Sequence, residues 1–72
     1  MTPYMYDYSK LLGKLRENRV TQLDFAKELG ISEAALNNKL KNRTEFKQSE
    51  MIKACLFLSI PIEGIGSYFF TK

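Results

Sequence analysis

The stretch that most constrains the fold is residues 21–42, which read TQLDFAKELGISEAALNNKLKN. Apolar residues recur at helical spacing as far as Leu29, the pattern breaks at Gly30, and it resumes from Ile31 on a new axis. Glycine carries no Cβ, so it is expected where the backbone must turn through a left-handed conformation. The stretch therefore predicts two short helices joined by a sharp turn, a helix-turn-helix.

Both helices of this motif have marked starts. Thr21 is a good N-cap for the first helix, and Ser32 is one for the second, where Glu33 also lies close to the N-terminal dipole. We expect the two helices to cover residues 22–29 and 33–41.

Three further helices are expected around the motif. The first precedes it, capped by Asp7, with apolar residues at i, i+3, i+4 and i+7: Tyr8, Leu11, Leu12 and Leu15. The second of the three covers residues 47–58, and its inward stripe is predicted to be Met51, Ile52, Cys55 and Leu58. The last is short and begins near Pro61, which suits a first helical position.

Gly64 and Gly66 weaken or end this last helix, and residues 67–71 are the only segment that could form a short strand. No repeat or linker divides the 72 residues. The sequence thus predicts one all-α domain, residues 1–72, a compact bundle of about five short helices.

The motif resembles the Cro and repressor class of phage helix-turn-helix proteins. The matching positions, in order, are Gln22, Ala26, Gly30, Ile31, Ser32 and Leu36. The C-terminal stretch FKQSEMIKACLFLSIPIEGIGSYFF is similar to small regulators of temperate phages of Gram-positive bacteria, including the modulator-of-repression proteins of lactococcal phages. The resemblance implies a lambda-repressor-like fold and a cytoplasmic regulator, Cro-like, in the lysis–lysogeny switch.

In this family the helix after the glycine lies in the major groove of operator DNA and reads base edges. The resemblance assigns that role to Gln22, Ser32, Glu33, Ala34, Asn37 and Asn38. Asparagine pairs with adenine, glutamate accepts from cytosine and alanine touches a thymine methyl, but no arginine is present to grip guanine, so affinity is expected to be modest. The alternatives are surface asparagines near a helix end, and a Glu33 that serves only the helix dipole.

A basic segment follows the predicted reading helix. The net charge is +3, and four of the cations fall within nine residues, at positions 39, 41, 43 and 47. Such a run is a solvated loop or, after a helix-turn-helix, a phosphate-binding patch. The predicted phosphate contacts are Lys39, Lys41, Asn42, Arg43, Thr44, Lys47 and Gln48.

Several apolar residues do not fit a self-sufficient DNA-binding domain. They are Leu23, Leu56, Tyr68, Phe69 and Phe70. Apolar side chains at exposed sites indicate a protein interface, used either for a weak homodimer or for docking onto the phage's own repressor. The C-terminal aromatics have a second interpretation, in which they close a small core together with Tyr4 and Tyr6.

Other classes of function are disfavoured. The chain has no histidine, its acids are scattered, and neither a metal-ligand spacing nor a phosphate-binding glycine loop is present, so we expect no enzyme and no cofactor. Cys55, the single cysteine, reads as a core residue in a reducing cytoplasm. Without a leader or an apolar run of about 18 residues, we expect no membrane insertion. The main alternative to DNA binding is an antirepressor that keeps the fold but acts by complexing the repressor.

Overall fold

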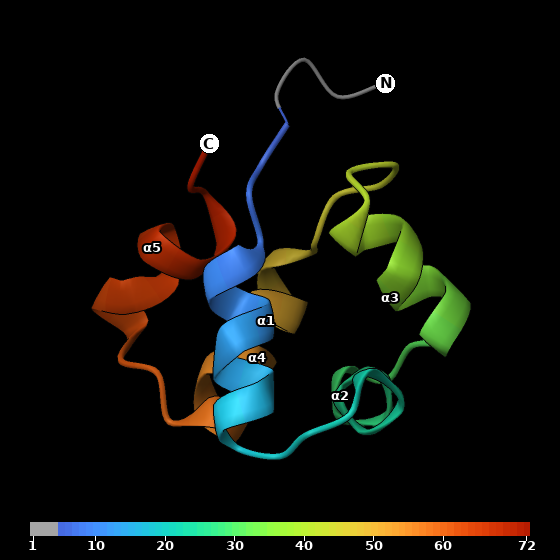
Figure 1. Cartoon of the computed structure of the whole chain (residues 1–72), viewed down its shortest axis with the longest axis horizontal. Helices are drawn as coiled ribbons and strands as arrows, with labels where there is room; N and C mark the ends of the chain where they lie inside the picture. The colour runs from blue at the N-terminus through green and yellow to red at the C-terminus, as the bar shows by residue number, and fades with distance from the viewer. Residues whose placement is uncertain (1–4) are drawn as a thin grey trace.

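A computed structural model describes residues 5–72, and within that range all of the regular secondary structure is helical (Figure 1). The elements are α1 (Ser9–Glu17), α2 (Gln22–Leu29), α3 (Glu33–Leu40), α4 (Gln48–Leu58), the short 3-10 helix η1 (Ile62–Gly64) and α5 (Ile65–Phe69). The predicted all-α fold is confirmed. The one segment that could have formed a short strand, residues 67–71, does not, because α5 occupies most of it and turns Phe69 into the core.

The helices form two groups around α1. In Figure 1, α2 and α3 lie on one side of α1, η1 and α5 lie on the other, and α4 passes behind. α2 packs against both α3 and α4, whereas α5 packs against α1 and α4. Because α4 contacts both groups, it connects the helix-turn-helix to the C-terminal part of the chain.

The local signals of the helix-turn-helix have the predicted roles. Thr21 Oγ1 accepts a hydrogen bond from the Asp24 amide at 3.1 Å, and Ser32 Oγ accepts one from the Ala35 amide at 3.0 Å. Gly30 ends α2 in the left-handed region, with φ 75° and ψ 29°. Each cap pairs an amide that the helix itself leaves without a partner.

The start of α1 also uses the side chain predicted to cap it. The Asp7 carboxylate accepts hydrogen bonds from the Ser9 amide at 2.8 Å and from the Ser9 hydroxyl, and these bonds lower the pKa of Asp7. The helix begins at Ser9, with Tyr8 rather than Asp7 as the flanking residue.

The core draws on every helix except η1. Its buried apolar residues are Tyr8, Leu11, Leu15, Phe25, Ala26, Leu29, Leu36, Phe46, Ala54, Cys55, Leu58, Ile60 and Phe69. The stripe predicted for α4 is wrong at one position: Ile52 is 39% exposed, and Ala54 is fully buried. The inward stripe is therefore Met51, Ala54, Cys55 and Leu58, spaced i, i+3, i+4 and i+7.

Aromatic side chains close the second part of the core. The Phe46 ring meets the rings of Tyr8 and Phe69 edge-on, with centroids 5.4 and 5.1 Å apart. Tyr6 meets Phe70 edge-on at 5.7 Å. Of the two interpretations of the C-terminal aromatics, the core assignment is therefore confirmed for Phe69. Tyr4, which was also assigned to this core, lies outside the described residues.

Within residues 5–72 no single helix is long and apolar enough to cross a membrane. Taken together, α4 and residues 62–69 have the length and apolar composition of a membrane span, but the two segments are bent by 118° relative to each other.

Candidate functional site

The predicted reading helix, α3, presents its first residues to solvent. Ser32, Glu33 and Ala34 are exposed, and Asn37 and Asn38 are half-buried. Leu36, on the opposite side, is fully buried and holds α3 against the core. The five predicted base readers of α3 are therefore all at least partly accessible, whereas Gln22 is half-buried beside the end of α1.

Arg43 lies next to one of these predicted base readers. Its Nη1 donates to Asn38 Oδ1 at 3.4 Å, and its backbone amide donates to the Asn38 carbonyl at 2.9 Å. The predicted phosphate contact and the predicted base contact thus form one continuous polar surface at the end of α3.

The prediction that Lys39 contacts phosphate is wrong. The residue is 7% exposed, its Nζ lies 3.2 Å from Glu50 Oε1, and it donates to the Glu45 carbonyl at 2.9 Å. Glu50 Oε1 also accepts the Lys47 amide at the start of α4, at 2.8 Å. Lys39 faces inward because it stands three residues after Leu36, on the same side of α3.

Asn42 is also a structural residue rather than a phosphate contact. Its Oδ1 accepts the Tyr6 amide at 2.9 Å and its Nδ2 donates to the Tyr6 carbonyl at 3.0 Å, so both ends of the side-chain amide are engaged. The backbone has φ 64°, a left-handed value that asparagine tolerates better than most residues.

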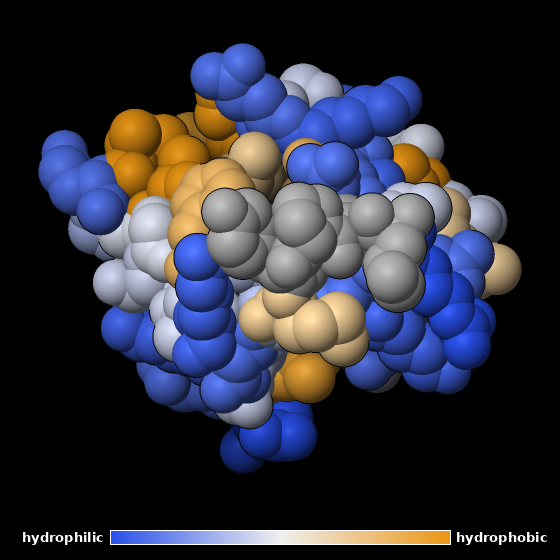
Figure 2. All heavy atoms as spheres, turned by 90° about the horizontal axis from the view of Figure 1, so that it is seen from above, coloured by the Kyte–Doolittle hydropathy of each residue, from blue (hydrophilic) through white to orange (hydrophobic). Residues whose placement is uncertain are grey.

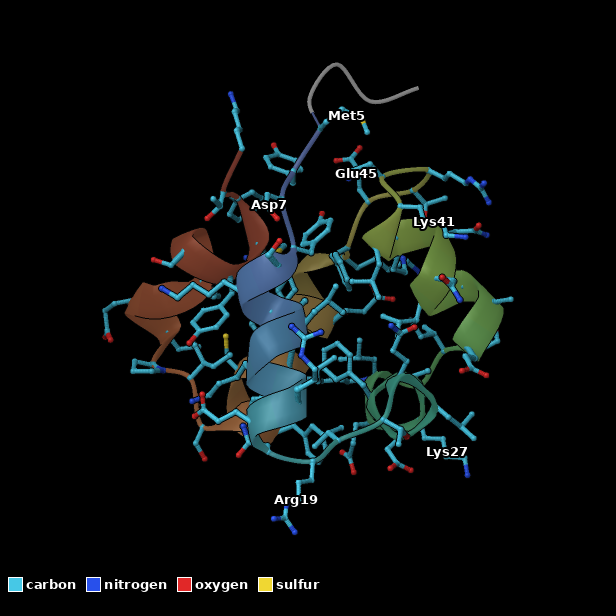
Figure 3. The ribbon with its side chains drawn as sticks, viewed as in Figure 1. Met5, Asp7, Arg19, Lys27, Lys41 and Glu45 are labelled. Atoms are coloured by element: carbon cyan, nitrogen blue, oxygen red, sulfur yellow. The ribbon has the colours of Figure 1, made fainter. Side chains whose placement is uncertain are left out.

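The other predicted phosphate contacts stay on the surface. They are Lys41, Arg43, Thr44, Lys47 and Gln48, all exposed. In Figure 3, Lys41 points outward at the end of α3, while Lys27 and Arg19 lie at the opposite end of the molecule. Lys27 and Arg19 therefore do not belong to the patch of predicted phosphate contacts.

The residues predicted for a protein interface divide into two groups. Leu56 is 75% exposed, Phe70 48% and Leu23 46%, so all three are available to a partner. Phe69 is only 1% exposed, and its assignment to the interface is wrong because its ring fills the core beside Phe46. Tyr68 is half-buried, and the Lys10 Nζ lies 4.9 Å from its ring centroid.

The structure adds an apolar groove that the sequence did not indicate. This α4–α5 groove, of about 410 Å³, is lined by Gln48, Met51, Ile52, Ile62, Ile65 and Phe70. Figure 2 shows hydrophobic residues gathered on the left of the molecule, the side on which η1 and α5 lie in Figure 1. The adjacent apolar residues Met51 and Ile52 were the available signal in the sequence, but only the packed helices show which of them lies outside.

Comparisons with known proteins agree with this architecture. A protein family described as "Protein of unknown function (DUF739)" matches residues 4–72. The solution structure of the modulator of repression of the temperate bacteriophage TP901-1 from Lactococcus lactis is similar, with a TM-score of 0.75 and 42% sequence identity. The match covers 90% of this chain and 88% of that one.

No curated protein sequence matches the chain. The predicted likeness to phage helix-turn-helix regulators, and to a lactococcal modulator of repression in particular, is confirmed. The chain belongs to the DUF739 family and is a relative of the phage TP901-1 modulator of repression.

Proposed function

We propose that the chain is a phage regulator that acts on repression by binding the phage's own repressor protein. The observation that carries this proposal is its likeness, over 90% of its length, to a protein described as a modulator of repression. Exposed apolar side chains on α4 and η1 supply the surface that such a partner needs, among them Leu56 and Ile62. The proposal involves no catalytic step.

The test mixes the purified chain with the repressor protein of the same phage. We expect calorimetry to give a saturable binding heat, and we expect the gel shift of the repressor on its operator to change as the chain is added. A repressor that gives no heat, and whose operator shift is unaffected, contradicts the proposal.

Binding of operator DNA by the chain itself is the second candidate function. It is supported by the exposed start of α3 and by the contact between Arg43 and Asn38 at its end. Asn38→Ala should then cost about 1–3 kcal/mol at one base pair of the operator.

Arg43→Ala should weaken binding to all sequences alike and reduce the salt slope by about one. Equal affinity of both variants and the wild type for every duplex would exclude this surface.

Salt separates the two candidate functions. Neutralising several phosphates releases counterions, so affinity for DNA should fall steeply as salt rises. A contact made by apolar side chains should respond weakly, since surface ion pairs contribute little to it.

A further inference from the structure

We propose that the α4–α5 groove is the site at which the repressor is held, and that it takes the aliphatic face of an amphipathic helix of that repressor. This inference rests on the proposed function and names the surface through which it acts. Four features of the described residues carry it: the outer face of α4, the form of the groove, the charges at its rim and the area available.

The outer face of α4 carries apolar side chains that face solvent. Ile52 and Leu56 stand four residues apart, one above the other on the helix, and are 39% and 75% exposed. The inner face is already satisfied by the core. A helix at the surface of a globular domain normally carries polar residues on its outer side, so this second apolar face indicates a partner.

The groove beside this face has the form of a receptor for a helix. The chain bends by 118° between α4 and residues 62–69, and both segments contribute residues to the lining of the groove. Its lining contains one polar side chain, Gln48, and no charged one. Ile62 and Phe70, 54% and 48% exposed, form its outer wall. Binding of an amphipathic helix in an apolar groove is a recurrent mode of protein recognition.

The charges at the rim favour a protein over a polyanion. Lys53 and Glu28 lie together beside Leu56 and Phe57. Glu63 follows Ile62 in the chain and is exposed, so charges of both signs border the apolar surface. Nucleic acid and anionic membrane surfaces are recognised by clustered lysine and arginine. A mixed polar rim around an apolar centre is the arrangement found at protein–protein interfaces.

The available area indicates how far the contact extends. A stable complex of standard size buries about 800 Å² on each partner, which is about one sixth of the 4784 Å² surface of this chain. The few side chains of the groove fall short of that area. The contact must therefore continue across Ile52 to Leu56 and Phe57, whose exposed fractions are 75% and 37%.

The experiment compares three substitutions of exposed residues by glutamate, measured by calorimetry against the repressor. Ile62→Glu and Leu56→Glu should each weaken binding by at least about tenfold, the loss typical of a central apolar contact. Met5→Glu, at the start of the described chain and 69% exposed, is the matched control and should stay within about twofold of the wild type. Thermal unfolding of all three should stay close to that of the wild type, which shows that the fold is intact.

The outcomes distinguish this inference from the proposed function. If the wild type binds the repressor and the two groove-side variants bind equally well, the groove is wrong and the function stands. If Met5→Glu alone abolishes binding, the interface lies at the start of the described chain and not at the groove. If the wild type does not bind the repressor at all, the function fails. Concentration-dependent dimers of the chain that Ile62→Glu dissociates, with no repressor bound, would assign the groove to a second copy instead.

Discussion

Gly30 shows how a single residue sets the turn of the helix-turn-helix. Its φ of 75° disfavours any residue with a Cβ, yet a Cβ placed there would meet only the Lys53 Nζ, at 4.0 Å. The cost of substitution is therefore backbone strain without a clash. We predict that Gly30→Ala lowers the free energy of unfolding by about 1–2 kcal/mol, and that Gly30→Asn lowers it less. Urea unfolding measures both; equal losses for the two variants would contradict a strain mechanism.

Cys55 gives the stability a dependence on alkaline pH. Burial raises the pKa of its thiol, so the folded chain keeps a proton that the unfolded chain releases. The contribution of this protonated thiol to the free energy of unfolding is complete below an unfolded thiol pKa of about 8.5. It is lost as the pH rises through the higher pKa of the folded state. We predict that stability falls less between pH 7 and pH 10 in Cys55→Ala than in the wild type. Parallel curves from urea unfolding would contradict this.

Sequence predicts some residues well and others poorly, for a physical reason. Thr21, Ser32 and Gly30 act on their own backbone or on amides three residues away, so their roles can be read locally. The positions of Lys39 and Asn42 depend instead on partners distant in the sequence, Glu50 for Lys39 and Tyr6 for Asn42. A charge pattern cannot distinguish a phosphate contact from a buried pair.

At the scale of elements, the pair of Lys39 and Glu50 joins the end of α3 to the start of α4. The two side chains are 9% and 6% exposed. Removing one member of a buried pair leaves an uncompensated charge, so Lys39→Met should destabilise the chain by about 3–5 kcal/mol. The double variant Lys39→Met/Glu50→Met should recover most of that loss. Additive losses in a double-mutant cycle of denaturant unfolding would contradict the coupling.

The helices themselves were largely predictable, because their boundaries depend on caps and spacing. The predicted range of α2 matches the structure, and those of α3 and α4 each differ by one residue at one end. The phase of α4 was not predictable at every position, since both Ile52 and Ala54 are compatible with an apolar stripe. Packing against α2 and α5 buries Ala54 and leaves Ile52 beside the groove. The α4–α5 groove was missed for that reason.

At the scale of the whole molecule, the two ends of the described chain are tied together. The Asp7 amide donates to the Thr71 carbonyl at 2.6 Å. The neighbouring residue, Tyr6, pairs through its backbone with the side chain of Asn42. Residues 5–7 thus join the C-terminus to the loop after α3, and Figure 1 shows the start of the described chain and its C-terminus on the same side. The predicted reading surface and the α4–α5 groove consequently belong to one packed unit.

Two neighbouring aromatic residues separate the roles of core and surface in this unit. Phe69 is 1% exposed and Phe70 48% exposed, although they are adjacent in sequence. Phe69→Ala should cost about 3–5 kcal/mol, which is most of the stability of a domain this small, because it empties the space beside Phe46. Phe70→Ala should cost less, about 0.5–1.5 kcal/mol for the lost edge-on contact with Tyr6, but should weaken repressor binding because the ring lines the groove. Thermal unfolding and calorimetry on both variants test this separation. Equal destabilisation by the two substitutions would place Phe70 in the core and remove one wall from the proposed interface.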